Sequence, residues 1–236
     1  MNQHSVQKAY LKAFEDPSGR IQVYRKTGGK PFPRPASDCA AEEDFQPRKL
    51  ESFQEKFMET PASEALRATG LWTEDEFRPI SMWTALHIIR SSKSRKEFFK
   101  SNEEYSRRFH EEFENELLSS DYYKLVFVHR CQNGRFLVTS DNPIIELEID
   151  GLLVRCFAKS PEILILFSPI NNVPKFEIPI EDYFNAMVWA FADEFIYSHR
   201  SDVSMASLKQ VADIFGMSPV FEDVGFYVDP SGSQLR

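Results

Sequence analysis

Three polar residues far apart in the chain, His4, Arg90 and Asp141, have the side chains needed for acid–base chemistry on an anionic substrate. Histidine donates or accepts a proton near neutral pH, arginine binds an anionic oxygen, and aspartate can orient the imidazole or take up a proton. Each residue lies where we expect a helix or strand to end, which is where sites are usually built. We therefore predict that these three residues form a catalytic site for metal-independent phosphoryl or phosphodiester hydrolysis.

Four further residues are candidates for substrate binding. Ser140 and Asn142 flank Asp141 in the stretch Ser-Asp-Asn-Pro, which follows an apolar run. Lys93 lies in residues 88–100, which carry five cationic residues and one glutamate, a local charge of +4. A cationic stretch of this kind can bind phosphate groups. The fourth candidate, an asparagine of a later helix, follows from the family resemblance given below.

Each of these residues also has a structural alternative, which the sequence leaves open. His4 could cap the first helix, and Arg90 could pair with an acidic neighbour or with the last carbonyl groups of its helix. The residues around Asp141 could form an Asx turn, in which short polar side chains bind nearby backbone amides. Residues 88–100 could be the solvated end of a helix.

The N-terminal elements must position His4. Val6, Tyr10 and Phe14 recur every four residues and predict a helix with one buried face, ending at the turn residues 16–19. The segment "IQVYRK" then predicts a short strand. Residues 27–48 hold two adjacent glycines and four prolines, so we expect a loop there.

The remaining elements predict an α+β fold. Residues from about 50 to 120 show helical periodicity, with stripes that include Trp83, Leu86, Ile89, Tyr105, Phe109 and Phe113. From residue 122 the pattern changes to strands, and Asn133-Gly134 predicts a hairpin between "YYKLVFVHR" and "RFLVTS". Asp150-Gly151 predicts a second hairpin. The run "EILILF" lacks alternation and should be a central strand, and two helices follow.

These elements would build one domain from residues 1–236. We expect a central, mainly antiparallel sheet over about residues 122–168, packed with N-terminal and mid-chain helices and with C-terminal helices. A helical portion, about 50–120, and an α+β portion, about 121–236, would be joined by the N-terminal segment.

Charge and composition limit the classes of function. The net charge is −8, but residues 1–50 carry nine Lys and Arg against six Asp and Glu, whereas residues 141–236 carry six against fifteen. The acidic total argues against a protein that wraps nucleic acid non-specifically, and it does not exclude a local anion site. No apolar run approaches the ~20 residues that span a bilayer. The three cysteines show no metal-ligand spacing. We expect a cytoplasmic protein without membrane contact, cofactor or bound metal.

Five segments occur in an order that resembles an uncharacterised, mainly bacterial family, DUF4238. The segments are "NQHSVQKAYLKAF", "ALHIIRSSKSR", "LVTSDNPII", "ILILFSP" and "FNAMVWAFADEFIYS". The resemblance spans nearly the whole chain and implies that Asn185, in the last segment, belongs to the site. Gln7 stands where the family usually has proline, so this chain lacks one device that makes a helix start rigid. The family offers no established activity to carry over.

Two functions from different classes follow. The first is a hydrolase or nuclease acting on a nucleotide or RNA phosphate, as a toxin or phage-defence effector. The second is a non-catalytic module that binds a small anionic ligand or a protein partner, in which the same polar residues form a structural network.

Overall fold

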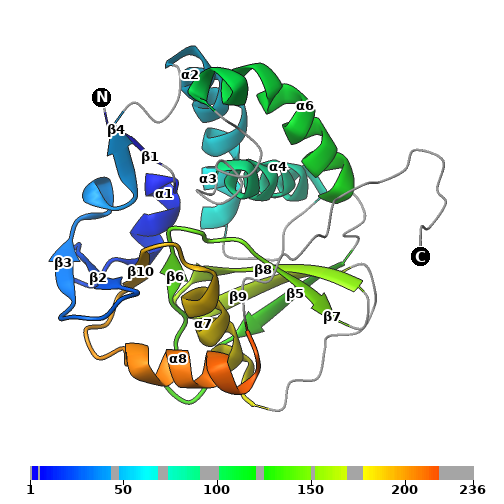
Figure 1. Cartoon of the computed structure of the whole chain (residues 1–236). Coiled ribbons are helices and arrows are strands. Elements are labelled where there is room, and N and C mark those ends of the chain that lie inside the picture. The colour runs from blue at the N-terminus through cyan, green and yellow to red at the C-terminus, as the bar shows by residue number, and fades with distance from the viewer. Residues whose placement is uncertain are drawn as a thin grey trace.

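The computed structural model describes residues 2–4, 6–43, 48–68, 74–90, 101–120, 125–149, 152–168 and 178–217. Within them, two four-stranded antiparallel sheets and a two-stranded sheet pack with helices, so the predicted α+β class is confirmed (Figure 1). The strands are β1 (Asn2–His4), β2 (Ile21–Arg25), β3 (Phe32–Arg34), β4 (Ala41–Glu43), β5 (Leu125–Arg130), β6 (Thr139–Ser140), β7 (Ile145–Ile149), β8 (Leu152–Ser160), β9 (Ile163–Ser168) and β10 (Phe195–Ser198). The helices are α1 (Lys8–Leu11), α2 (Arg48–Gln54), α3 (Thr60–Arg67), α4 (Glu74–Arg90), α6 (Asn102–Ser120), α7 (Ile180–Phe191) and α8 (Met205–Ile214), with the short 3-10 turns η1 (Lys12–Phe14) and η2 (Ala36–Asp38) and the π-helical turn η3 (Glu55–Glu59).

The first large sheet has the strand order β5-β9-β8-β7 and comes from one stretch of chain. Ile149 of β7 pairs with Leu152 of β8, so the predicted two-residue hairpin connection is confirmed. The predicted central strand is β9, which lies between β5 and β8 and is buried along nearly all its length. Its apolar run is explained by packing on both faces.

The other predicted hairpin is wrong. The turn itself forms, with φ of 55° at Asn133 and 72° at Gly134. However, β5 pairs with β9, and β6 pairs with β10 of the second large sheet. The residues between the turn and β6 form hydrogen bonds with partners other than β5. For example, the amide of Leu137 donates to the carbonyl of Pro161 over 2.8 Å. Local turn chemistry therefore predicted the bend correctly and the strand partner incorrectly.

The second large sheet, with the order β3-β2-β10-β6, joins distant parts of the chain. The predicted strand "IQVYRK" is confirmed as β2, which pairs with the C-terminal strand β10. The expected loop over residues 27–48 is partly regular, since it contains β3, η2 and β4. Pro33 is compatible with β3 because an edge strand needs backbone partners on one side only.

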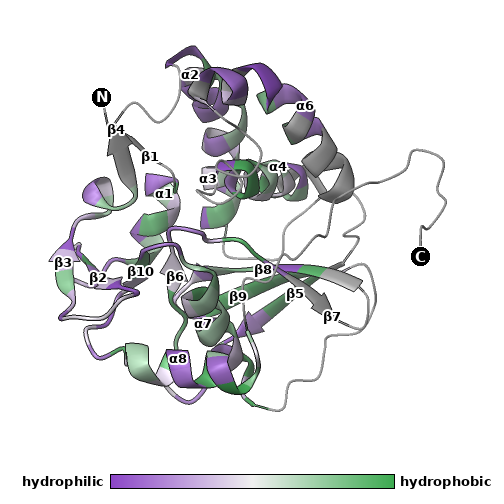
Figure 2. Ribbon diagram, viewed as in Figure 1, coloured by the Kyte–Doolittle hydropathy of each residue, from purple (hydrophilic) through white to green (hydrophobic). Residues whose placement is uncertain are grey.

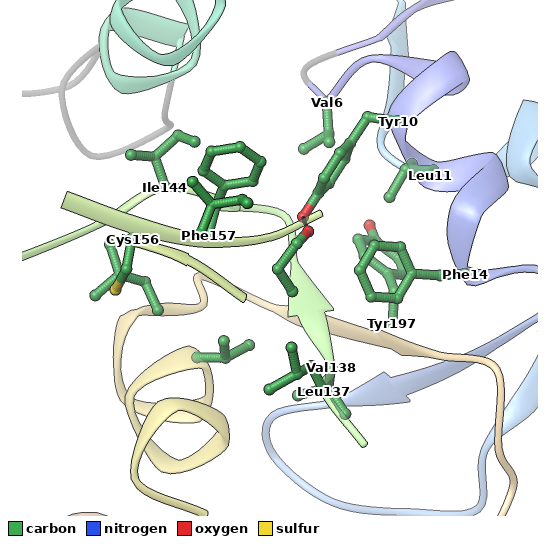
Figure 3. Close-up of a cluster of buried hydrophobic side chains, with 14 of the residues drawn as sticks. Val6, Tyr10, Leu11, Phe14, Leu137, Val138, Ile144, Cys156, Phe157 and Tyr197 are labelled. Atoms are coloured by element: carbon green, nitrogen blue, oxygen red, sulfur yellow. Dashed lines mark hydrogen bonds between the residues drawn. The ribbon is translucent and has the colours of Figure 1, made fainter. Parts of the chain in front are cut away.

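The N-terminal apolar stripe is buried as predicted. Val6, Tyr10, Leu11 and Phe14 lie in the main core, although the helix is a short α1 continued by the 3-10 turn η1. Figure 3 shows these side chains facing Val138, Phe157 and Tyr197. The hydroxyl of Tyr10 donates to the carbonyl oxygen of Ala158 in β8 over 2.8 Å, and it lies 2.8 Å from Thr139 Oγ1 of β6. Tyr10 thereby ties α1 to both large sheets.

Helices cover both faces of the first large sheet. Figure 1 shows α4 on one side of it and α7 on the other. On the α4 side, the rings of Trp83 and Phe157 have centroids 5.1 Å apart, and those of Phe77 and Phe167 are 5.7 Å apart. Figure 2 shows hydrophobic residues where these elements meet and more hydrophilic ones on α2 and on parts of β3.

The helical stripes pack against one another as predicted. A second cluster of buried side chains joins α2, η3, α4 and α6. It contains Leu50, Met58, Ala85, Leu86, Ile89, Tyr105, Phe109 and Phe113. Helix α4 therefore contributes one face to the main core through Trp83 and another to this cluster.

Candidate functional site

A cleft of about 360 Å³ lies between α1, η1, α3 and the end of β8. Figure 1 shows α1 beside α3, with β8 passing below them. The lining residues are Lys8, Ala9, Tyr10, Lys12, Ala13, Ser63, Leu66, Arg67 and Lys159. Four of the nine are cationic and none is acidic, so the cleft is positively charged in a chain of net charge −8.

Helical periodicity places two of these cations. Tyr10 and Leu11 point into the core, so the opposite face of α1 and η1 carries Lys8 and Lys12, both exposed. These residues are four apart and lie on neighbouring helical turns. The same stripe that docks the N-terminal helix therefore aims two lysines into the cleft.

The opposite wall comes from α3 and β8. Arg67 is the last residue of α3 and is exposed. Lys159 follows the buried Ala158 on β8, and its ammonium donates a hydrogen bond to the carbonyl oxygen of Ala68, just after α3. A cation at a helix C-terminus satisfies a free carbonyl group and interacts well with the helix dipole. Lys159 is therefore held in place by the end of α3.

Ser63 connects the cleft to a buried polar network. Its hydroxyl donates to the backbone carbonyl of Glu59 over 2.7 Å and accepts a hydrogen bond of 2.7 Å from Nε2 of Gln7. Gln7 also donates its backbone N–H to Nε2 of His87 over 3.2 Å. Burial and the nearby Arg90 lower the pKa of His87 to about 3, so this imidazole is neutral at physiological pH.

Three of the four cleft cations lack acidic partners in the described part of the chain. Lys8, Lys12 and Arg67 form no ion pair with any residue in the described ranges. Exposed cations elsewhere do, for example Lys209 with Asp213 at 2.6 Å. The positive charge of the cleft is therefore available to a ligand.

Arg90, predicted to clamp phosphate, ends α4 and is 2 % exposed. Its guanidinium forms an ion pair with the Glu59 carboxylate and donates a hydrogen bond to Oε1 of Gln54. Both partners border or belong to the π-helical turn η3, where one extra residue per turn changes the direction of side chains. The guanidinium is thus engaged by side chains of the protein itself.

Asp141, predicted to orient the histidine, follows β6. Its Oδ1 accepts the backbone N–H of Asp193 over 2.9 Å, and its Oδ2 accepts those of Glu194 and Phe195 over 2.7 and 2.8 Å. The Asp141 amide returns a bond of 3.1 Å to the carbonyl of Phe195. This carboxylate therefore fixes the turn between α7 and β10. Burial raises the pKa of Asp141 to about 6, while the three N–H groups act in the opposite direction.

We expect stability to depend on pH through this carboxyl group. The folded-state pKa of about 6 lies above the ordinary value of 3.8, so the protonated form is favoured by folding. The resulting stability is fully present below about pH 4 and is lost as the pH rises to about 6. The difference in unfolding free energy between the parent and Asp141→Asn should therefore fall by on the order of 3 kcal/mol between those pH values. Denaturant melts measure it, and a difference that grows with pH would refute the expectation.

The substrate-binding candidates Ser140, Asn142 and Asn185 form local and tertiary hydrogen bonds. Ser140 Oγ donates to the carbonyl of Asn142 over 2.8 Å and accepts its N–H over 3.1 Å, which closes a tight turn. Asn185 of α7 accepts the N–H of Val138 over 2.9 Å and donates to the carbonyl of Phe136 over 2.8 Å. Its amide thus takes the place of a neighbouring strand for residues 136–138.

For the two remaining candidates, His4 and Lys93, the structure describes no side chain. The backbone of His4 pairs with Ala41 as part of β1 and β4. The His4 side chain and Lys93 lie outside the described residues. Arg90 and Asp141 bind different partners, the first among helices and the second between β6 and β10. The roles predicted for these residues therefore stay predictions.

The described ranges contain neither a cluster of metal ligands nor a membrane-spanning helix. No group of three or more His, Cys, Asp or Glu side chains within them could hold a metal ion. None of the helices in that part of the chain is long and apolar enough to cross a membrane.

Sequence reasoning missed the cleft. The available signal was the Lys8 and Lys12 pair, four residues apart on the polar face of a predicted helix with no acidic residue between them. Arg67 and Lys159 gave no local signal, because their position beside α1 depends on tertiary packing.

Comparison with known proteins adds the family. The sequence profile described as "Protein of unknown function (DUF4238)" matches residues 2–122, just over half of the chain. Two of the five segments that suggested this family lie within the match, and the other three follow it. Neither a curated protein nor a solved structure matches the chain. The extent of the profile match shows that the chain belongs to the DUF4238 family of proteins of unknown function.

Proposed function

We propose that the protein binds a small organic anion, such as a phosphate-bearing metabolite, in the cleft between α1 and α3. The observation that carries this proposal is the lining itself: four cations and no acidic side chain surround about 360 Å³. Ligand sites commonly enclose about 300–1,000 Å³. The net charge of −8 argues against a generally cationic surface, so the excess of cationic residues in the cleft needs a separate explanation.

The chemistry of the walls favours a phosphate group attached to an apolar or aromatic part. Lys8 and Lys12 form a like-charge pair, which destabilises a helix by about 0.2–0.5 kcal/mol and is relieved by a bound anion. Lys159 is already fixed by the Ala68 carbonyl, so less side-chain entropy is lost when a ligand binds. Leu66 and the neighbouring alanines offer apolar contact for the rest of the molecule.

We expect AMP, used as the probe, to raise the melting temperature of the protein by binding only the folded state. Lys12→Gln/Arg67→Gln should weaken AMP binding by about tenfold or more, since each charge-assisted contact to phosphate contributes about 1.5–3 kcal/mol. Thermal shift titrations with AMP and with inorganic phosphate measure both effects and show how much the apolar walls add.

The matched control is Lys56→Gln/Arg108→Gln, which removes the same charge from the exposed Lys56 on η3 and the half-buried Arg108 on α6, both outside the cleft. It should bind AMP as the parent does. No shift with either probe, or equal weakening by the two double variants, would refute an anion site in the cleft.

A second candidate is the metal-independent hydrolase or nuclease acting on a nucleotide or RNA phosphate, with His4, Arg90 and Asp141 as its acid–base machinery. The observation in its favour is the Asp141 pKa of about 6, a value suited to proton transfer near neutral pH. Assays of the same titration samples for hydrolysis products separate the two candidates. Turnover that is lost in Asp141→Asn would favour the hydrolase, whereas saturable binding without turnover favours the binding protein.

A further inference from the structure

The β2–β3 hairpin is a second cationic surface. Residues 17–37 contain no Asp or Glu and five cationic residues. These are Arg20, Arg25, Lys26, Lys30 and Arg34. Lys26 caps α7 by donating to the carbonyls of Ala190 and Ala192, both over 2.8 Å, whereas the other four side chains are exposed. The hairpin thus displays four cations on an acidic protein.

The hairpin is a fixed platform. β2 pairs with β3 on one side and with β10 on the other, and Ile21 and Val23 anchor it in the main core. Gly28 and Gly29, with φ of 100° and 112°, supply the left-handed conformation that the connecting turn needs. The cationic side chains are therefore carried by a sheet, and their relative positions are set by strand pairing.

One aromatic ring holds two of the guanidinium groups. Arg25 and Arg34 lie over the ring of Phe32, at 5.7 and 5.2 Å from its centroid. Cation–π contacts at exposed sites contribute about 0.5–1 kcal/mol each, and here they restrict two flexible side chains to one place. Guanidinium groups bind phosphate oxygens through a planar fork, so ordering them beforehand reduces the entropy cost of binding.

Acidic neighbours do not neutralise these cations. In the part of the chain that the structure describes, Arg20, Arg25, Lys30 and Arg34 form no ion pair. Acids close to this stretch in sequence form hydrogen bonds with other groups, and an Asp38 oxygen accepts the hydroxyl of Ser37 over 2.9 Å. A Glu15 oxygen accepts the N–H of Ala36 over 3.2 Å, and an Asp16 oxygen accepts that of Ser18 over 2.8 Å.

We propose that the β2–β3 hairpin binds a single-stranded nucleic acid through its phosphodiester backbone. The four exposed cations lie at the ends of the two paired strands: Arg25 ends β2, Arg34 ends β3, and Arg20 and Lys30 lie just before β2 and β3. β2 is about 16 Å long at ~3.3 Å per residue, so the cations are spread over a length that spans a few consecutive phosphates of an extended nucleic-acid strand. A membrane surface fits less well, because stable binding there draws on inserted apolar side chains as well as charge. Of the hairpin's aromatic residues, Tyr24 is buried and Phe32 is half-buried beneath two arginines.

Cations and prolines on an edge strand also have a purely structural use, since they prevent pairing with the edge of another sheet. Among the strands that the structure describes, β3 is such an edge strand. This role predicts no nucleic-acid binding, so a binding measurement decides between the two uses.

The test measures binding of a labelled uridine oligomer of about 12 nucleotides by fluorescence anisotropy. With four phosphates neutralised, the logarithm of the binding constant should fall against the logarithm of salt concentration with a slope of about −3. Arg25→Gln/Arg34→Gln should make the slope shallower by about 1.4 and weaken binding about tenfold at low salt. If that variant does not fold, Arg20→Gln/Lys30→Gln removes two charges from exposed positions outside the strand pairing.

The matched control is Arg108→Gln/Arg135→Gln, which makes the same change in net charge at arginines paired with Glu104 and Asp182. It should keep the parent slope and affinity. The proposal is overturned if the oligomer fails to bind the parent at low salt, if both double variants lose affinity equally, or if only the cleft variant Lys12→Gln/Arg67→Gln loses it. Binding to phosphatidylserine vesicles without binding to the oligomer would overturn it as well.

Discussion

Arg90→Met is expected to lower the free energy of unfolding by about 3–5 kcal/mol, because it removes one partner of a buried ion pair. The Arg90 side chain is 3 % exposed, and its guanidinium contacts the Glu59 carboxylate and the Gln54 amide oxygen. Without the guanidinium, the Glu59 carboxylate stays largely out of water with no cation beside it. Urea melts of the parent and the variant measure the loss.

Two further variants separate the ion pair from simple loss of volume. Glu59→Met in the Arg90→Met background removes the uncompensated charge and should recover much of the stability, since apolar replacements of buried pairs are often neutral. Arg108→Met removes an arginine from a more exposed pair with Glu104 and should change stability by less than about 1 kcal/mol. An Arg90→Met protein as stable as the parent would contradict the structural role and would leave Arg90 free to bind a ligand.

Tyr10→Ala is expected to destabilise the protein by at least about 3–5 kcal/mol, the usual cost of removing a buried aromatic ring. The ring is 2 % exposed and packs against Trp83 with centroids 5.0 Å apart. The hydroxyl adds its bonds to Ala158 and Thr139, which join both large sheets. Tyr10→Phe keeps the ring and should cost about 1–3 kcal/mol, because the Ala158 carbonyl loses its hydroxyl partner.

A double-mutant cycle with Thr139→Val tests the bond between the two hydroxyl groups. Since the single Tyr10 proton goes to Ala158, Thr139 donates to the Tyr10 oxygen. Tyr10→Phe and Thr139→Val should therefore be coupled by about 0.5–3 kcal/mol. Additive effects of the two substitutions would show that the hydroxyl groups do not interact and that α1 is held by apolar packing alone.

Helical periodicity was the most reliable guide in the sequence. The spacing of Val6, Tyr10 and Phe14, and that of Trp83, Leu86 and Ile89, identified side chains that are buried in the structure. Periodicity succeeds here because each stripe needs only its own helix and one apolar surface to cover it. The bounds of the first helix were less well predicted, since α1 changes to a 3-10 turn after four residues.

Strand pairing could not be read from the sequence where the partners are distant. The Asn133-Gly134 turn is a local property, but β6 pairs with β10, more than fifty residues away. Asn185 supplies two hydrogen bonds to the segment that was expected to pair with β5, so that segment needs no strand beside it. A sequence pattern shows which residues suit a sheet and does not name their neighbours.

The candidate site illustrates the same limit. Residue types alone directed attention to Arg90 and Asp141, whose described contacts are with the protein's own side chains and backbone. The cleft is formed by α1, the end of α3 and the end of β8. Lys8, Arg67 and Lys159 are far apart in sequence, and only the fold brings them to the lining of one cleft. The charge distribution along the chain left room for a local anion site without locating it.

The most direct measurement is a crystal structure of the parent grown or soaked with tungstate, a heavy anion of the size and geometry of phosphate. The account predicts an anomalous density peak in the cleft, within contact distance of at least two of Lys8, Lys12, Arg67 and Lys159. Loss of that peak in Lys12→Gln/Arg67→Gln crystals would tie it to the cleft cations. An empty cleft, with tungstate bound instead beside Arg90, would contradict the account and return the site to a residue that the sequence first suggested.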